Sequence, residues 1–166
     1  TSIRDDDPVI FMESEMMYGD KGEVPEEEYL IPIGEANVIH DGNDVTLISF
    51  GKMMKIAEET YKEAKRENIS IEVIDLRSVR PIDYTSIINS VKKTNRLVII
   101  EEAWPLASIS SEISHHIQRF AFDFLDAPIH RITCADVPFH YAPTLIKEIT
   151  PNVKKVINAI KKVTYR

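Results

Sequence analysis

The most informative segment of this sequence is Val45-Thr46-Leu47-Ile48-Ser49-Phe50-Gly51. A short run rich in Val, Leu and Ile is typical of a strand that is buried on both faces of a sheet. Beyond Gly51, apolar residues recur at the spacing of an amphipathic helix, at Met54, Ala57, Tyr61 and Ala64. Strand, glycine and helix in this order predict a β-α unit of a parallel sheet.

The same alternation continues on both sides of this segment. Five apolar runs have the length of buried strands: residues 9–12, 45–50, 71–76, 97–100 and 129–134. Three further helical patterns cover residues 84–91, 109–120 and 153–163. Ser108 is predicted to cap the second of these, and Thr150 and Pro151 are predicted to begin the third. Alternating strands and helices predict an α/β fold with a mainly parallel sheet covered on both faces.

Residues 18–42 do not follow this pattern. They contain an acidic run at 26–28. They also contain several turn-forming residues: Gly19, Gly22, Pro25, Pro32 and Gly34. We interpret them as a long surface loop that returns to the sheet, and loops of this length are often functional or interfacial. The chain is therefore divided into a junction segment, residues 1–42, with the first strand and the long loop, and a main domain, residues 43–166.

The composition limits the classes of partner. The 27 acidic and 20 basic residues give a net charge of −7, which argues against nucleic acid or an anionic membrane and favours a partner with a basic face. No apolar run reaches the roughly 18 residues of a membrane helix. The single cysteine, Cys134, excludes an internal disulfide and a cysteine-based zinc site, and favours a reducing compartment. Because the chain does not begin with Met, we expect it to be a piece of a longer protein.

The residues alone predict no catalytic constellation. Phosphate-binding glycine motifs, H-E-x-x-H and G-x-S-x-G are all missing. Gly51 could place a helix start beside an anion, but a simple tight turn is the favoured interpretation. The adjacent His115 and His116 are expected to be solvated, and Cys134 to be an inert packing residue.

Four carboxylates lie at predicted strand ends, where ligands bind in parallel sheets: Glu13, Glu15, Glu101 and Glu102. Either pair could perform acid–base chemistry if burial raised one pKa. We favour the alternative that they cap neighbouring helices or pair with Arg77 and Arg80.

Six motifs in order resemble the second half of pyruvate dehydrogenase E1 beta subunits. They are Ile3-Arg4-Asp5-Asp6-Asp7-Pro8-Val9-Ile10-Phe11-Met12-Glu13 with Met17-Tyr18-Gly19, Tyr29-Leu30-Ile31-Pro32-Ile33-Gly34, Asp75-Leu76-Arg77-Ser78-Val79-Arg80-Pro81-Ile82-Asp83, Glu101-Glu102-Ala103-Trp104-Pro105, Phe124-Leu125-Asp126-Ala127-Pro128 and Ala135-Asp136-Val137-Pro138. The resemblance implies a transketolase C-terminal-like domain: three layers, with a mostly parallel five-stranded sheet, one antiparallel edge strand and helices on both faces.

The resemblance also implies an activity for the complete protein. Two alpha and two beta subunits would form a heterotetramer that decarboxylates pyruvate on thiamine diphosphate and acetylates the lipoyl group of the E2 component, in bacterial cytoplasm or the mitochondrial matrix. The activating glutamate and the active-site histidine belong to a preceding domain, and the alpha subunit holds the diphosphate and its magnesium. We therefore transfer no catalytic or cofactor-binding residue, and expect this chain alone to be inactive and not to bind the cofactor.

Two sites follow from the resemblance. Asp126 and the terminal carboxylate, here that of Arg166, match positions that receive arginines of the basic peripheral subunit-binding domain of E2, and Asp123 is expected to assist. Exposed carboxylates that face arginine form charge-assisted hydrogen bonds. Alternatively, Asp126 only ends a helix. A potassium ion at the domain junction, bound in some family members, would take oxygens from the positions of Ile3, Asp5 and Asp7.

Further partner contacts are expected at a surface around Tyr18, Trp104, Pro105 and Phe139, unless Trp104 is a core residue. Two rival functions are retained. One is the beta subunit of a branched-chain 2-oxo acid dehydrogenase. The other is an independent α/β module that binds a small anion at Gly51 and the carboxyl ends of the strands.

Overall fold

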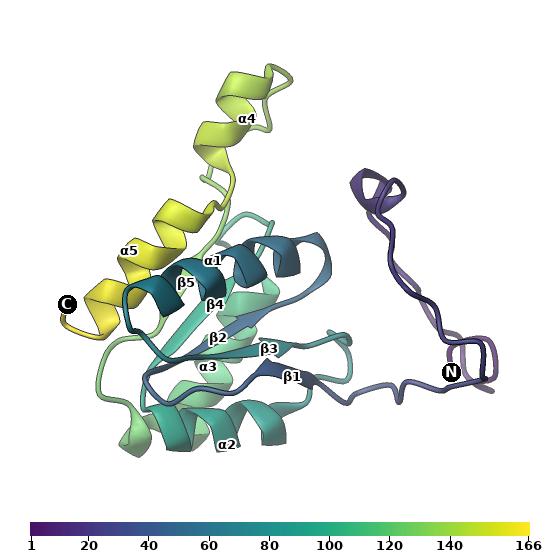
Figure 1. Cartoon of the computed structure of the whole chain (residues 1–166), viewed down its shortest axis with the longest axis horizontal. Coiled ribbons are helices and arrows are strands. Elements are labelled where there is room, and N and C mark those ends of the chain that lie inside the picture. The colour runs from purple at the N-terminus through teal and green to yellow at the C-terminus, as the bar shows by residue number, and fades with distance from the viewer.

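A computed structural model describes all residues, 1–166, and shows one five-stranded sheet in the order β1-β3-β2-β4-β5 (Figure 1). The strands are β1 (Asn37–His40), β2 (Val45–Ser49), β3 (Ile71–Asp75), β4 (Leu97–Ile100) and β5 (His130–Ile132). β1 pairs antiparallel with β3 at one edge, and every other pairing is parallel. The predicted three-layer fold with one antiparallel edge strand is confirmed.

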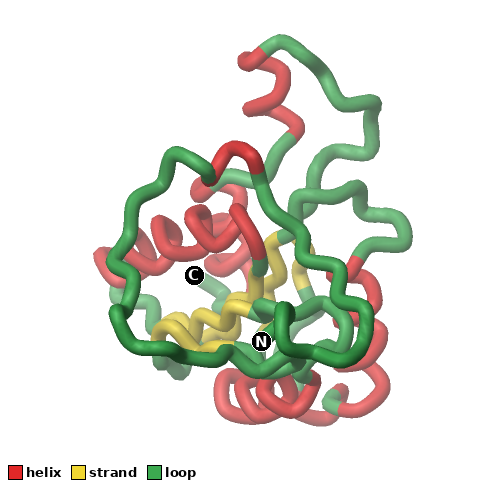
Figure 2. The backbone as a smooth tube through the Cα atoms, turned by 90° about the vertical axis from the view of Figure 1, so that its right-hand side faces the viewer, coloured by secondary structure: helices red, strands yellow, loops and turns green.

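Helices cover both faces of the sheet (Figures 1 and 2). They are α1 (Met54–Arg66), α2 (Tyr84–Thr94), α3 (Ile109–Phe120), α4 (Pro143–Ile149) and α5 (Val153–Val163). α1 and α5 pack on one face, where Leu47 and Val73 meet Ala57 and Ile160. α2 and α3 pack on the other face, on Ile48 and its neighbours. All five residues of β2 are buried because β2 is the central strand.

The first predicted strand, residues 9–12, is not formed. Its apolar side chains are exposed, Ile10 by 89%, and the edge of the sheet is occupied by β1 instead. β1 was missed because an edge strand of sequence Asn-Val-Ile-His is only half-buried and carries no continuous apolar signal. It lies in the segment that was expected to return to the sheet.

Helix starts agree with the sequence except at α5. Ser108 caps α3, as predicted, by accepting a hydrogen bond from the Ser111 backbone N–H. α5 is capped by Asn152, whose Oδ1 accepts from the Lys155 backbone N–H at 3.0 Å, so Thr150 was the wrong choice. Thr150 donates its hydroxyl to the Ile146 carbonyl and belongs to the end of α4, a helix that the apolar pattern did not predict.

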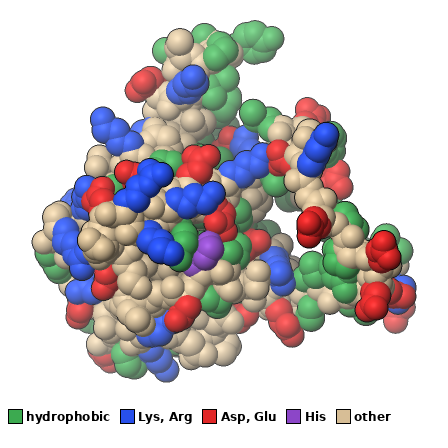
Figure 3. Space-filling view, in the orientation of Figure 1, with side chains coloured by type: hydrophobic (Ala, Val, Ile, Leu, Met, Phe, Trp, Pro, Cys, Tyr) green, Lys and Arg blue, Asp and Glu red, His purple; other side chains and the backbone are tan.

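Two segments project from the body of the domain: residues 1–36 and the region of α4 (Figures 1 and 3). The first carries eleven of the 27 acidic residues and only two basic ones, Arg4 and Lys21. It contacts the body through Asp20, which pairs with Lys55 of α1, and through the Gly34 and Ala36 N–H groups, which donate to Ser78 and Asp83. A short 3-10 helix, η1 (Glu15–Met17), is its only regular element. None of the helices has the length and apolar character needed to cross a membrane.

Candidate functional site

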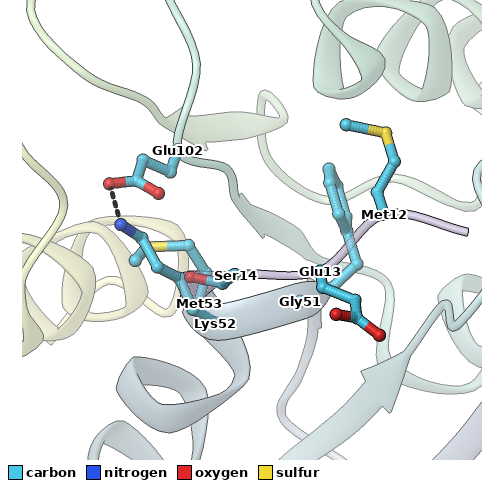
Figure 4. A pocket seen from close by; sticks show the side chains of 8 residues that line it. Met12, Glu13, Ser14, Gly51, Lys52, Met53 and Glu102 are labelled. Atoms are coloured by element: carbon cyan, nitrogen blue, oxygen red, sulfur yellow. Dashed lines mark ion pairs between the residues drawn. The ribbon is translucent and has the colours of Figure 1, made fainter. Parts of the chain in front are cut away.

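Two groups of polar residues lie at opposite ends of the sheet. At the carboxyl ends of the strands, a shallow pocket of about 280 Å³ lies between the N-terminal segment and the start of α1 (Figure 4). It is lined by residues 12–14, residues 50–53 and Glu102. Lys52 pairs with Glu102 at 2.6 Å across the pocket, while Glu13 accepts a hydrogen bond from the Tyr18 hydroxyl. The cation that could attract an anion is therefore already neutralised.

The carboxylates at this end have structural roles. Glu101 is buried and accepts backbone N–H groups from Ile109 at 3.0 Å and Ser110 at 2.8 Å, so it satisfies the first turn of α3. The capping interpretation is confirmed for Glu101. The partner of Glu102 is Lys52 rather than an arginine. Gly51 has a φ of +56°, which a residue with a side chain rarely adopts, and this supports the tight-turn interpretation.

Cys134 and His116, the remaining candidates for a nucleophile and a metal ligand, have surroundings that do not favour these roles. Burial, with the nearby Glu102 charge, raises the pKa of the Cys134 thiol, which makes it a poor nucleophile at neutral pH. His116 stacks on Tyr84 with ring centroids 3.6 Å apart, and desolvation lowers its pKa. No group of three or more His, Cys, Asp or Glu side chains is placed to hold a metal ion.

Three of the four predicted partner-facing residues, Tyr18, Trp104 and Phe139, are exposed, and Pro105 is partly buried. Trp104 is 50% accessible, so it is not a core residue, and its indole N–H donates to the Val137 carbonyl at 2.8 Å. Tyr18 and Phe139 are each more than half exposed. The Trp104 hydrogen bond ties two loops together while leaving the ring face in solvent.

The second group lies at the amino ends of the parallel strands. Four loops meet there, because each parallel strand begins at this end and α5 returns to it. Asp44 precedes β2, Arg96 precedes β4 and Asp126 precedes β5. Arg96 Nη2 lies 3.3 Å from Asp126 Oδ2, and Arg96 Nη1 donates to the Asp44 carbonyl at 3.3 Å.

The end of the chain joins this group. Tyr165 donates its hydroxyl to the Asp126 carbonyl at 2.8 Å, which places the two predicted docking segments side by side. Arg166 donates to the Asn68 carbonyl at 2.9 Å and lies 3.5 Å from Asp44 Oδ2. We call Asp44, Arg96, Asp126, Tyr165 and Arg166 the amino-end cluster.

Asp126 does not end a helix. The short 3-10 helix η3 (Phe122–Phe124) ends before Asp126. The backbone N–H of Asp126 donates to the Asn95 carbonyl at 2.8 Å. Asp123 lies on η3 and is exposed. Arg96, Asp44 and Tyr165 were missed at the sequence level because they are separated from Asp126 by 30 or more residues and belong to no local motif.

The predicted potassium ligands lie in an exposed turn at the start of the chain. The Asp5 carboxylate accepts the Asp7 backbone N–H at 3.0 Å, and Ile3 is fully exposed. None of these three residues lines the carboxyl-end pocket or belongs to the amino-end cluster.

Comparisons with known proteins agree with this geometry. The family "Transketolase, C-terminal domain" matches residues 34–156. The chain is 46% identical over 165 residues to the pyruvate dehydrogenase E1 component subunit beta of Rickettsia felis, covering 99% of this chain and 51% of that protein. It is 45% identical to the mitochondrial subunit beta of Dictyostelium discoideum, covering 100% of this chain and 48% of that protein. The chain thus spans about half the length of the curated relatives it matches.

Among solved structures, a split-gene transketolase described as an inactive beta4 tetramer aligns with a TM-score of 0.73 at 24% identity. The alignment covers 87% of this chain and 46% of that chain, and at this identity it supports the fold alone. The sheet order, the antiparallel edge and the match over residues 34–156 lead to one conclusion. The chain belongs to the transketolase C-terminal domain family.

Proposed function

We propose that the chain is the C-terminal domain of the beta subunit of pyruvate dehydrogenase E1. The observation that carries this proposal is the identity of 45–46% to named E1 beta subunits over essentially the whole chain. The complete enzyme would decarboxylate pyruvate oxidatively on thiamine diphosphate and transfer the acetyl group to lipoyl-E2. The relatives include bacterial and mitochondrial forms, which supports a location in bacterial cytoplasm or the mitochondrial matrix.

The role of this domain in that enzyme is assembly and docking rather than chemistry. Three of the four candidate carboxylates are engaged within the chain: Glu101 caps α3, Glu102 is paired with Lys52, and Glu13 accepts a hydrogen bond from the Tyr18 hydroxyl. Thiamine diphosphate and magnesium would be held by the alpha subunit and the preceding beta domain. The one cationic side chain that lines the carboxyl-end pocket, Lys52, is paired with Glu102, so the pocket offers no unpaired cation to a diphosphate.

Subunit assembly would use the carboxyl end of the sheet. The N-terminal segment and the α4 region project there with large exposed apolar side chains, including Tyr18, Trp104 and Phe139 beside Pro105. Exposed apolar surface of this extent is typical of interfaces between subunits. The E1 alpha subunit and the second beta subunit would pack against this apolar surface.

E2 docking would use the amino-end cluster. The Asp126 side chain is 57% exposed, and its backbone is held on both sides by Asn95 and Tyr165. A fixed, accessible carboxylate is suited to a charge-assisted hydrogen bond with an arginine of the basic subunit-binding domain. Asp123, on the adjacent 3-10 helix, would add negative potential, and the Arg166 carboxylate would receive a second arginine.

A potassium ion at the N-terminal turn is a further part of the proposal. Asp5 Oδ2 and the backbone carbonyls of Ile3 and Asp7 are oxygen donors of the type a hard cation takes. Asp5 Oδ1 already accepts the Asp7 N–H, so this turn supplies only part of a coordination shell. The remaining oxygens would come from outside this chain.

The proposal is tested by isothermal titration of the chain with the subunit-binding domain of pyruvate dehydrogenase E2. Nucleotides and inorganic phosphate are titrated in parallel, together with the E2 domain of a branched-chain complex. Binding of the pyruvate-type domain in preference to the others is expected. Preference for the branched-chain domain would reassign the complex, and stabilisation by nucleotide alone would indicate an anion-binding module.

A further inference from the structure

The amino-end cluster contains a largely buried cation, Arg96, which lies beside Asp126. Arg96 is only 24% exposed, and its Nη1 donates to the Asp44 carbonyl at 3.3 Å and the Thr94 carbonyl at 3.5 Å. Its Nη2 faces Asp126 Oδ2 at 3.3 Å. A planar guanidinium held by backbone carbonyls on one edge presents its other edge in a fixed direction. Arg96 is therefore a permanent neighbour of the carboxylate rather than a mobile surface charge.

Asp126 is equally constrained. Its N–H donates to the Asn95 carbonyl and its own carbonyl accepts from Tyr165, both at 2.8 Å, while the carboxylate itself remains 57% exposed. Oδ2 is turned toward Arg96. A cation that approaches from solvent must share Asp126 with Arg96. It is attracted by the Asp126 carboxylate and repelled by the Arg96 guanidinium, which lies 3.3 Å from that carboxylate.

We infer that Arg96 is the specificity-determining residue of this docking surface, a fixed counter-ion that weakens binding of any single cation to Asp126 and selects arginine over lysine. This inference rests on the proposed docking function. A lysine ammonium is a compact, strongly hydrated charge that feels the full repulsion of Arg96. An arginine can bind the carboxylate through two parallel N–H bonds, and its delocalised charge tolerates a neighbouring guanidinium. Arg96 thus supplies the repulsive element that selective interfaces use.

The test is the affinity of the E2 subunit-binding domain for the Arg96→Gln variant. At low salt, Arg96→Gln is expected to bind about two- to fivefold more tightly than wild type, the range of an exposed ion pair. The gain should disappear near 1 M salt, where the screening length is about 3 Å. Replacing the partner's arginines by lysine should weaken binding less in Arg96→Gln than in wild type.

Three further variants test whether the effect of Arg96→Gln comes from the Arg96 charge at this place in the fold. Lys52→Gln removes the same charge from an ion pair at the opposite end of the sheet and should leave affinity unchanged. In the Asp126→Asn background, Arg96→Gln should still improve binding, because the repulsion between Arg96 and the partner's cations does not require the Asp126 carboxylate. Arg96→Met retains the buried stem and should reproduce the effect of Arg96→Gln if glutamine disturbs the fold.

Two results would overturn the inference. Weaker or unchanged binding by folded Arg96→Gln and Arg96→Met would make Arg96 a positioning residue only. If wild-type chain does not bind the E2 domain at all, the docking function itself fails, and the inference fails with it. The wild-type titration distinguishes the two cases.

Discussion

The two ends of the sheet are built differently. At the amino end, short loops hold Arg96, Asp126 and Tyr165 in hydrogen bonds to backbone carbonyls, and the surface is polar and fixed. At the carboxyl end, two long segments leave the body and expose large apolar side chains. A single α/β domain therefore carries a polar, hydrogen-bonded surface at one end of its sheet and an exposed apolar surface at the other.

Removing the Glu101 carboxylate, at the carboxyl end of the sheet, should destabilise the domain most. Glu101→Ala should lower the free energy of unfolding by about 2–4 kcal/mol, because the Ile109 and Ser110 N–H groups lose their acceptor at the start of α3. Urea denaturation measures the change. Glu102→Ala is the matched control, and its partly exposed pair with Lys52 should contribute under about 1 kcal/mol. Equal effects of the two variants would contradict the capping role.

Asp126→Ala should act only on the amino end. It is expected to weaken binding of the E2 domain by about 1–3 kcal/mol, roughly 5- to 150-fold in Kd, with affinity falling as salt rises. Titration calorimetry measures the affinity, and circular dichroism checks the fold. Undiminished affinity in a folded variant would remove Asp126 from the docking surface, whereas a matching loss in Asp123→Ala would show that both carboxylates contribute.

Asp83→Ala tests how the N-terminal segment is joined to the body. Asp83 caps α2 by accepting the Ser86 N–H at 3.0 Å, and it also accepts the Ala36 N–H at 3.1 Å. Its removal should cost about 1–2 kcal/mol of unfolding free energy in urea denaturation. Asp83→Asn retains an acceptor and should cost less.

The same residue predicts a pH dependence. Burial alone would raise the pKa of Asp83, but hydrogen bonds from Ser86, Ala36 and Thr85 outweigh it and hold the pKa below the ordinary 3.8. A lowered folded-state pKa gives stability that is present above pH 3.8 and is lost as pH falls through the folded-state value. The stability difference between wild type and Asp83→Ala should therefore shrink in strong acid. A constant difference would exclude the ionised cap.

The smallest effect is expected at Trp104. Trp104→Phe removes the N–H that donates to the Val137 carbonyl together with part of the ring, at a half-exposed position where water can replace the lost hydrogen bond. We expect a loss of about 0.5 kcal/mol in thermal or urea unfolding. A loss of several kcal/mol would mean that the ring is packed as a core residue, contrary to its exposure.

Much of the fold could be predicted from local pattern. The strands β2, β3 and β4 and the helices α1, α2, α3 and α5 have a buried face, so their apolar residues recur with the period of the element. β5 is a half-buried edge strand, and it could be predicted because the apolar residues Ile129 and Cys134 flank it and extend the apolar run. β1 and α4 could not be predicted in this way, because β1 is half-buried at an edge and α4 buries little more than Ile149. The misplaced strand at residues 9–12 is the converse case, an apolar run with no partner in the domain.

The candidate site divides in the same manner. Asp126 could be proposed from its motif, but Arg96 and Tyr165 could not, because they lie 30 and 39 residues from it and meet it only at the amino end of the sheet. Glu101 illustrates the opposite outcome. Its place at the end of a buried strand was compatible with acid–base catalysis or with capping of a helix. The position of α3, whose Ser110 N–H donates to Glu101, shows that it caps this helix.

The alternation of strands and helices could be predicted from the residues alone, because the apolar residues of a strand or helix that packs on a core recur with a period of two or 3.6. The family likeness and the acidic balance of the N-terminal segment are likewise visible in the residues alone. Only the folded chain brings Arg96 to Asp126 and Lys52 to Glu102, since the partners of these two salt bridges lie 30 and 50 residues apart and no local spacing relates them. For this protein, the pairing of Arg96 with Asp126 is the consequence that matters most.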